Sequence, residues 1–512
     1  MAVRLVAAAA LAVAAQAAAA RWPQFRGPDG SGVSGDGSFP TEFGPGTNQW
    51  WKVALPPGNS SPCIWDEALF ITAYAEPDHR VLCLDARTGE LRWERSMVGA
   101  PRERGSGLSN PASPTSCTDG ERVISYFGPL GVVCHDFDGR ELWRRLLPEP
   151  ATQHGVGTSP VLADDRVILL RDQDVGSHLL ALDKRSGETV WRAERPDFRR
   201  GFCTPLVTGS PLFLADLLTG HEPPDSLYRP TGEGRGEGSR SMGSGRDVLV
   251  IAPGTLRIVA YDARDGQERW RVVGLPNEIC ASPVAGDGLI FCAGWTPGSG
   301  VARMPGFGGL LAAGDRNGDG QLARDEVPSG PAAQHFNYMD ADRDGMLSRA
   351  EYEFIAGVFQ QSQNALLAVR PGGSGDVTGS HVAWRHARGL PYVPTPLLYR
   401  GRLYLLKNGG LLTCLEAKSG EVLFQEERLG VVGDNYASPV AADGKIAIVS
   451  QSGTVAVVGV ADGLEVLARN PLGEPVLATP AVAHDALYIR SRQHLWAFKT
   501  AMPRSQRTQA SP

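Results

Sequence analysis

Two twelve-residue segments of this 512-residue chain, 315–326 and 340–351, carry oxygen-bearing side chains at a spacing that suits a hard cation. Each has carboxylates or an amide at positions 1, 3 and 5, a glycine at position 6 and a glutamate at position 12. A calcium ion takes about six to eight oxygens, including a backbone carbonyl at position 7 and a bidentate carboxylate at position 12. We therefore predict calcium ligands at Asp315, Asn317, Asp319, Gln321 and Glu326, and at Asp340, Asp342, Asp344, Met346 and Glu351.

This spacing is that of the EF-hand calcium loop, which requires a helix before and after each segment. Residues 307–313 can form the first helix, and short helices must suffice between the loops, where two prolines intervene. An apolar stripe follows Glu351 and fits the last helix: Tyr352, Phe354, Ile355, Val358 and Phe359. Leu322 and Leu347 should form a small β contact between the loops. We predict two calcium ions in a structural or docking element; the alternative is a pair of acidic turns without metal.

The composition restricts the rest of the molecule. The 62 glycines and 38 prolines make up about a fifth of the chain, which excludes a mainly helical fold. With 42% hydrophobic and 21% charged residues, the chain can bury a large core. The net charge of −6 leaves no basic excess for a phosphate backbone, so we expect no nucleic-acid partner.

A repeated unit organises the chain outside the two acidic segments. It opens on Ser-Pro or Thr-Pro, continues as two β-rich runs and closes on an Asp-x-x-x-Gly-x-x-x-Trp turn, complete at 85–93, 183–191 and 262–270. Glycine suits the positive-φ position of such a hairpin, and the tryptophan can pack on the next sheet. Sheets of this kind bury their faces by radial stacking, so we predict an all-β, eight-bladed β-propeller of four-stranded blades. The eight openings are Ser61, Ser113, Ser159, Thr204, Ser282, Thr395, Ser438 and Thr479.

The ring should close through its two ends. Trp51 is followed five residues later by Pro56, as Trp143 is by Pro148, so residues 49–54 match the last strand of a unit whose beginning is missing. The final unit has an opening but no closing tryptophan. We therefore predict that residues 49–54 pair with the C-terminal strands and complete the last blade.

With these repeats, and with the opening Trp22-Pro23-Gln24-Phe25-Arg26-Gly27-Pro28, the chain resembles the exported branch of the PQQ-like repeat propellers over nearly all of residues 22–500. The resemblance implies either a quinoprotein dehydrogenase, with the quinone and calcium on the propeller axis, or a non-enzymatic propeller such as the lipoprotein of outer-membrane barrel assembly. The adjacent cysteine pair and the Cys-x-x-Cys-His haem site found in many of the dehydrogenases do not occur in this sequence. We expect a non-enzymatic binding or scaffold protein without PQQ; the alternative is a PQQ-dependent alcohol or sugar dehydrogenase.

The domain boundaries follow from these assignments. We expect a signal peptide at 1–20, an N-terminal extension at 21–48, a first propeller part at 49–298, the calcium-binding EF-hand pair inserted in blade five at 299–363, a second propeller part at 364–500 and a disordered tail at 501–512. A flexible, glycine-rich insertion occupies 209–245 in the fourth unit. The second strand of that blade could be 212–215 or 248–252, and we favour the latter.

The signal peptide predicts export to the periplasm or beyond the cell as a protein without a membrane span, which we expect to be a monomer. Five of the eight cysteines occupy positions where sister units have Ala or Val, so we expect free, buried thiols rather than disulfides. These five are Cys63, Cys83, Cys117, Cys134 and Cys414. The partner would be an envelope protein, a peptide or a glycan. Four residues of the loops before the first strands could line an axial funnel, or could be ordinary solvated loop residues: His154, Arg200, Asp434 and Asn435.

Overall fold

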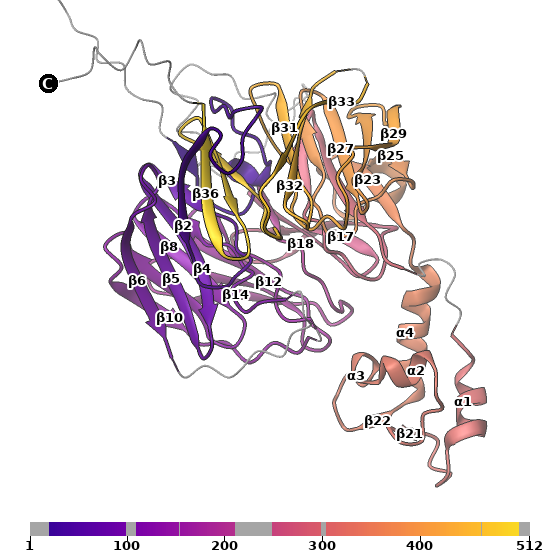
Figure 1. Ribbon diagram of the computed structural model, residues 1–512. Coiled ribbons are helices and arrows are strands. Elements are labelled where there is room, and N and C mark those ends of the chain that lie inside the picture. Colours follow the sequence, from indigo (N-terminus) through magenta and orange to yellow (C-terminus); the bar gives the residue numbers. More distant parts are fainter. Residues whose placement is uncertain are drawn as a thin grey trace, which may run out of the picture.

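The computed structural model describes residues 20–98, 109–152, 154–209, 248–297, 304–461 and 463–500. Within them, eight sheets of four or five strands stand around a common axis as propeller blades, which confirms the predicted fold (Figure 1). The predicted signal peptide before residue 20, the glycine-rich insertion beyond residue 209 and the tail from 501 lie outside the described residues. In the described part, no helix is both long and apolar enough to span a bilayer.

Blades one to four are antiparallel meanders whose innermost strand comes first in the sequence. Blade one consists of β3 (Cys63–Trp65), β4 (Ala68–Ala75), β5 (Asp78–Asp85) and β6 (Leu91–Met97), with β1 (Arg21–Trp22) beside β3. Blade two consists of β7 (Cys117–Thr118), β8 (Arg122–Phe127), β9 (Gly131–Asp136) and β10 (Glu141–Arg145), and blade three of β11 (Val161–Ala163), β12 (Arg166–Arg171), β13 (His178–Asp183) and β14 (Thr189–Glu194). Blade four consists of β15 (Leu206–Thr208), β16 (Leu249–Gly254), β17 (Arg257–Asp262) and β18 (Glu268–Val273), with the parallel β24 (Gly375–Asp376) at its outer edge.

Blades five to eight continue the same pattern. Blade five consists of β19 (Val284–Gly286), β20 (Leu289–Gly294), β23 (Ala365–Val369) and β25 (Val382–His386), with the short α5 (Thr378–His381) before its last strand. Blade six consists of β26 (Leu397–Tyr399), β27 (Arg402–Lys407), β28 (Leu411–Glu416) and β29 (Val422–Arg428), and blade seven of β30 (Val440–Ala442), β31 (Lys445–Val449), β32 (Thr454–Gly459) and β33 (Glu465–Pro471). Blade eight consists of β34 (Ala481–Ala483), β35 (Ala486–Arg490), β36 (His494–Lys499) and β2 (Gln49–Ala54).

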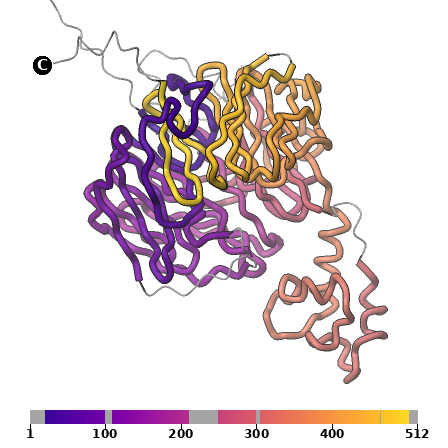
Figure 2. The backbone as a smooth tube through the Cα atoms, in the orientation of Figure 1, coloured from indigo at the N-terminus to yellow at the C-terminus, as the bar shows by residue number. Residues whose placement is uncertain are grey.

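The two ends of the chain close the ring in blade eight. Strand β2 pairs antiparallel with β36, with Lys52 opposite Trp496 and Val53 opposite Leu495. The indigo and yellow ends of the tube accordingly run side by side (Figure 2). The predicted closure by residues 49–54 is confirmed. In blade four, β16 pairs with β15, which confirms the choice of 248–252 as the second strand of that blade.

Five of the closing tryptophans dock on the hairpin of the next blade. The Trp143 Nε1 donates to the Lys184 carbonyl at 3.0 Å, and a Cβ on Gly187 would lie 2.4 Å from the indole ring. Gly187 has a φ of 73°, so both its backbone conformation and the indole require glycine. The same arrangement joins four further pairs: Trp51 with Gly89, Trp93 with Gly139, Trp191 with Gly266, and Trp384 with Gly420.

A belt of hydroxyl groups links consecutive blades near the axis. The backbone N–H of Ser159 donates to Thr204 Oγ1 at 3.0 Å, and the N–H of Thr204 donates to Ser282 Oγ at 2.9 Å. Such bonds run from blade one to blade eight through Ser61, Thr115, Ser159, Thr204, Ser282, Thr395, Ser438 and Thr479, which we call the hydroxyl belt. The prediction that Ser113 opens the second unit is wrong. Ser113 donates to the Asn110 carbonyl within a turn, and Thr115 occupies the belt position of blade two.

Residues 20–48, which we call the N-terminal strap, lie across the end of the ring where the first strands finish. The strap pairs with β3 in blade one, and Gly32 and Ser34 bond Ala441 of blade seven. Arg26 is fully buried and reaches the level of the belt, where it donates to the carbonyls of Pro439 at 3.1 Å and Pro396 at 3.0 Å. No carboxylate pairs with it in the described residues, and burial lowers its pKa to about 9. The strap therefore fills this end of the axis.

The eight cysteines are free thiols in the structure, and all except the half-buried Cys280 are buried. Burial raises the pKa of the Cys63 and Cys117 thiols. These side chains therefore act as small apolar residues of the blades, as predicted.

Candidate metal centre

The two acidic segments lie in an insert between β20 and β23 of blade five, which projects from the ring (Figure 1). Its elements are α1 (Phe307–Gly314), β21 (Leu322–Ala323), α2 (Pro331–Gln334), α3 (Phe336–Met339), β22 (Met346–Leu347) and α4 (Arg349–Gln361). Strands β21 and β22 pair antiparallel with Leu322 opposite Leu347, which confirms the predicted contact between the loops. The helices between the loops are as short as predicted. Pro328, which follows the first loop, prevents a longer helix there because proline cannot continue one.

A small apolar core holds the two loops together. Phe307 of α1 and Tyr352 of α4 are buried, with ring centroids 5.4 Å apart, and the Tyr352 hydroxyl donates to the Pro305 carbonyl at 2.6 Å. Ile355 and Val358 continue the buried face of α4, while Phe354 and Phe359 of the same stripe are half-buried. Because Met339 of α3 belongs to the same core, the helices before and after the second loop are packed together, which fixes where the loop begins and ends.

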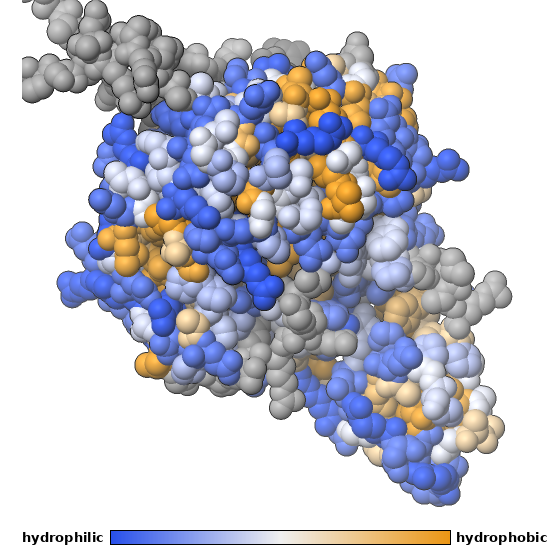
Figure 3. All heavy atoms as spheres, viewed as in Figure 1, coloured by the Kyte–Doolittle hydropathy of each residue, from blue (hydrophilic) through white to orange (hydrophobic). Residues whose placement is uncertain are grey.

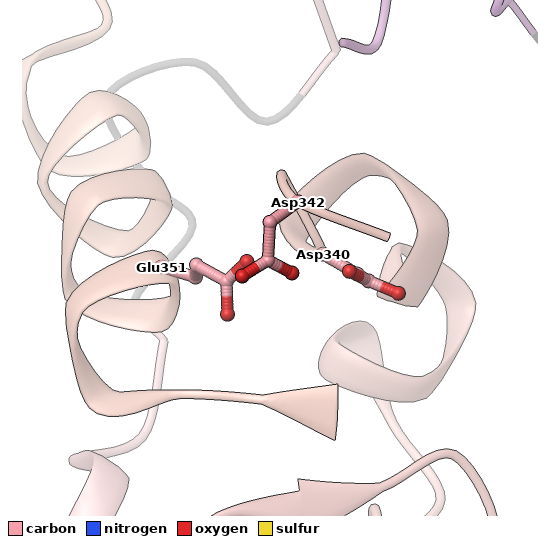
Figure 4. Close-up of side chains that lie close together, drawn as sticks. All are labelled: Asp340, Asp342 and Glu351. Carbon is pink, nitrogen blue, oxygen red and sulfur yellow. The ribbon is translucent and has the colours of Figure 1, made fainter. Parts of the chain in front are cut away.

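The second loop brings three of its predicted ligands to one point. Carboxylate oxygens of Asp340, Asp342 and Glu351 lie within 4.8 Å of one another, and the side chains point into one space (Figure 4). Asp340 is only 7% exposed, and its buried Oδ1 has no hydrogen-bond partner among the described residues. Burial raises the pKa of Asp340, with the neighbouring Glu351 and Asp344 charges acting in the same direction. A cation at this point would satisfy the buried oxygen and relieve the repulsion.

The backbone of the second loop is folded by the remaining oxygens of the same side chains. Asp340 Oδ2 accepts from the Gly345 N–H at 3.2 Å, and the Glu351 carboxylate accepts from the Ala341 N–H at 2.7 Å and the Ser348 N–H at 2.9 Å. Asp344 Oδ1 accepts from the Met346 N–H at 2.7 Å. Burial acts to raise the pKa of Glu351, but hydrogen bonds from Ser348 and the backbone lower it.

The first loop has the same backbone but a looser cluster of side chains. Asp315 accepts from the Gly318 N–H at 2.7 Å and the Gly320 N–H at 3.1 Å, and Asp319 accepts from the Gln321 N–H at 2.8 Å. The Asn317 amide donates to Asp319 Oδ2 at 2.9 Å, whereas a carboxylate at this position would repel Asp319. Asp315, Asn317 and Asp319 are among the residues predicted to bind calcium in this loop.

An arginine also interacts with the first loop. Arg316 contacts Asp325, and its Nε lies 3.8 Å from Glu326 Oε1, while the Arg316 backbone N–H donates to the same oxygen at 3.3 Å. A cation in this loop must therefore share Glu326 with a guanidinium. Since the first loop also has one carboxylate fewer, its electrostatic attraction for a divalent cation is weaker than that of the second loop.

Sequence reasoning missed two side chains that support these ligands. Ser348 is the N-cap of α4 and forms a capping box with Glu351, which orients this carboxylate. The pattern Ser-x-x-Glu before an apolar helix is visible in the sequence and could have identified it. Arg316 could not be found in this way, because its effect depends on where its side chain points.

The four predicted funnel residues do not form one site. Asn435 is fully buried and bonds the Gly410 N–H at 3.1 Å and the Val449 carbonyl at 3.1 Å, so it holds neighbouring loops together. Arg200 is paired with Asp174 at 2.8 Å, and His154 lies against Phe202. Of the four, only Asp434 is exposed. Asn435 and Arg200 are buried and bonded within the ring, so neither is a solvated loop residue.

Comparisons with known proteins place the chain among propellers of one family. The family model described as outer membrane protein assembly factor BamB matches residues 77–216 and 225–509. The outer membrane protein assembly factor BamB of Alkalilimnicola ehrlichii is 32% identical over 163 residues, which cover 31% of this chain and 38% of that protein. The matched region thus spans about two fifths of the length of this relative.

Two solved structures share the fold. BamB from Moraxella catarrhalis has a TM-score of 0.51 and 12% identity, with 88% of this chain and 99% of that chain covered. The quinohemoprotein alcohol dehydrogenase from Comamonas testosteroni also has a TM-score of 0.51 and 12% identity, with 94% and 81% covered. At this identity the likeness concerns the fold, and it is equal for the two structures. The family match covers most of the sequence and includes both parts of the ring, and the chain therefore belongs to the outer membrane protein assembly factor BamB family of PQQ-like repeat propellers.

Proposed function

We propose that this protein is exported and acts in the cell envelope as a non-enzymatic, calcium-binding scaffold whose partner is another envelope protein. The observation that carries this proposal is the family match along both parts of the ring. The name of the Alkalilimnicola relative describes an assembly factor of the outer membrane, which agrees with a scaffold role and a protein partner. A peptide or a glycan is the other class of ligand that a rigid ring of loops can bind.

The architecture supports binding through the surface of the ring. The N-terminal strap occupies one end of the axis, with Arg26 bonded to carbonyls of blades six and seven. A partner therefore has the opposite end, the outer strands and the insert available. The face in view is mostly hydrophilic with separate apolar patches (Figure 3). Exposed apolar residues such as Leu142 and Val190 lie on different outer strands, β10 and β14. Loops at the free end, which include the exposed Asp434, are the natural place for a specific contact.

Calcium binding is the second part of the proposal. Two ions would be held by the ten predicted ligands, and the second loop supports this best, because it has four carboxylates and a buried Asp340 oxygen without a partner. In the envelope, calcium loops of this type can work at about 10⁻⁴–10⁻³ M. The ions would order the insert and fix its surface for docking.

A crosslinking experiment tests the scaffold role. A photoreactive amino acid replaces Asp434 at the free end of the ring, and Ser38 on the strap in a matched control, and both variants are expressed in the native host. The proposal expects a defined envelope protein to crosslink at Asp434 and not at Ser38. Equal crosslinking at the two sites, or none at either, contradicts a partner at the free end.

A second measurement tests the enzyme alternative. The purified protein is incubated with PQQ and calcium, and its absorbance and dye reduction are followed with alcohols and aldoses as substrates. We expect no stoichiometric quinone spectrum and no dye reduction. A stoichiometric spectrum with turnover would replace the scaffold by a quinoprotein dehydrogenase.

A further inference from the structure

The insert contacts the ring at a second place in addition to its base. The loop between β14 and β15 joins blades three and four and carries two adjacent arginines. The Arg199 guanidinium carbon lies 4.9 Å from the ring centroid of Phe354, and that of Arg200 lies 5.1 Å from the ring centroid of Tyr338. Arg199 is 7% exposed, Arg200 8% and Tyr338 5%, so both guanidinium groups are largely desolvated, while Phe354 is half-buried. Contacts of this kind are strongest when water is excluded.

The arginines are held in place by the ring itself. Asp174, in the turn between β12 and β13, accepts from Arg200 Nε at 2.8 Å and from Nη2 at 3.2 Å. The Arg199 backbone N–H donates to Thr255 Oγ1 at 2.8 Å, and its Nη1 donates to the Pro196 carbonyl at 2.6 Å. The ring therefore presents two oriented guanidinium groups to the insert.

The aromatic rings that meet these arginines are placed by the second calcium loop. Tyr338 is on α3, two residues before the first ligand, Asp340, and Phe354 is on α4, three residues after the last ligand, Glu351. Both rings can meet adjacent arginines only when α3 and α4 keep a fixed relative position. That position depends on the loop between them, where three carboxylates lie within 4.8 Å of one another.

The base of the insert is fixed independently of the loops. Ser362 bonds Asn277 in both directions, at 3.1 and 3.0 Å, and Asn364 bonds Thr296 at 2.8 and 3.1 Å. These bonds involve no predicted calcium ligand. The insert therefore stays attached to blade five whatever happens at its tip.

We propose that calcium in the second loop clamps the insert onto Arg199 and Arg200, and that calcium release frees the tip of the insert to move about its base. This inference rests on the proposed calcium binding and assigns it a consequence at the end of the ring opposite the strap. Without the cation, repulsion among Asp340, Asp342 and Glu351 separates α3 from α4, and the two aromatic rings lose their common spacing. Calcium thereby decides whether the insert forms one surface with the loop that joins blades three and four.

The coupling must act in both directions. If bound calcium favours the clamped position, the clamp must favour bound calcium by the same factor. Removing both arginines should therefore weaken calcium binding by about fivefold to fiftyfold at one site, although neither arginine is a ligand. The first loop, which carries neither Tyr338 nor Phe354, should keep its affinity.

Spin-label distances in the full chain test the clamp. Nitroxides are attached at Glu188→Cys on blade three and Glu353→Cys on α4, two exposed positions, and distances are measured with saturating calcium and with chelator. The native thiols are buried except for Cys280, and the unsubstituted chain, treated with the same label, measures background. We expect a narrow distance distribution with calcium and a broad one with chelator. The same distribution in both conditions overturns the clamp if calorimetry shows that calcium binds.

Substitutions then locate the clamp. The double variant Arg199→Gln, Arg200→Gln should give the broad distance distribution even with saturating calcium. Phe354→Leu removes one of the contacts from the insert side and should broaden the distribution in the same way. Arg400→Gln is the matched control, because Arg400 lies 5.3 Å from the Tyr399 ring in blade six and does not contact the insert. A narrow distribution in the double variant refutes the clamp while calcium binding stands. Absence of calcium binding to the unsubstituted chain refutes both proposals.

Discussion

The indole of Trp143 lies directly on the backbone of Gly187 in the following blade, and its Nε1 donates to the carbonyl of Lys184 at 3.0 Å. One residue of this pair supplies a large ring and the other supplies the space for it. Because the pair recurs at several blade junctions, ring stability depends on glycines at which a side chain cannot be accommodated.

Gly187→Ala should destabilise the protein by about 2–4 kcal/mol, as the sum of a strained positive φ and a clash with the indole. Urea denaturation measures the change. Gly176→Ala is the control, because Gly176 has a φ of 76° in the same blade but no atom within 4 Å of its Cβ position. If both variants lose the same stability, the contact with Trp143 contributes nothing.

Thr204→Val should lower the free energy of unfolding by about 1–3 kcal/mol, because the buried Ser159 N–H loses its acceptor. Thr204→Ser keeps the hydroxyl and should retain most of the stability. Both are compared by urea denaturation. A valine variant as stable as the serine variant would show that the hydroxyl belt is not needed to hold the blades.

Glu351→Gln should reduce calcium affinity more than Glu326→Gln, by about tenfold or more, as measured by titration calorimetry of the full chain. The physical reason is that Glu351 belongs to the cluster with Asp340 and Asp342, whereas Glu326 is shared with Arg316. In chelator, the two variants should melt within a degree or two of the unsubstituted protein. A larger loss for Glu326→Gln would contradict the proposed order of the two sites.

Acid should destabilise the ring through three buried histidines, His79, His135 and His178. Burial lowers the pKa of each to about 4. Between the ordinary value near 6.5 and about 4, the unfolded chain binds more protons than the folded one, so stability falls as pH falls. Above pH 6.5 each neutral histidine therefore makes its full contribution to the free energy of unfolding, which is up to about 3 kcal/mol and is lost as the pH falls towards 4.

Melting temperatures between pH 7 and pH 4, measured in chelator, check this dependence. His79→Phe is the simplest variant, because His79 lies between Tyr74 and Phe127 with ring centroids 4.9 and 5.1 Å away. It should flatten the pH profile even if its stability at pH 7 changes. An unchanged slope would show that His79 does not carry the effect.

Local repetition made much of the ring predictable. Trp51 could be assigned to an incomplete blade because its spacing to Pro56 repeats at Trp143 and Pro148. The same reliance on dipeptides misplaced the second unit, where Ser113-Pro114 has the expected residues but Thr115 makes the belt hydrogen bond. Hydrogen bonding by a hydroxyl requires no following proline, so the dipeptide was an imperfect guide.

Contacts between segments that are far apart in the chain could not be predicted from the sequence. Arg26 belongs to the motif of residues 22–28, but its distant partners are the backbone carbonyls of Pro396 and Pro439. Backbone groups are present in every residue, so the sequence does not show which of them an arginine will contact. All ten predicted ligands lie in the two loops, yet the difference between the loops depends on the orientation of Arg316. The contact of Arg199 with Phe354 likewise depends on how an insert folds back on a different blade.

The pairing of β2 with β36 has a consequence for the order in which the protein is made. Synthesis produces β2 among the first structured residues and β36 at the end, so blade eight cannot form before nearly the whole chain is available. Until then, the edge of β2 that pairs with β36 stays unpaired. A chain that stops before β36 keeps this edge open, which makes incomplete products recognisable to chaperones and proteases by a feature that the finished ring hides.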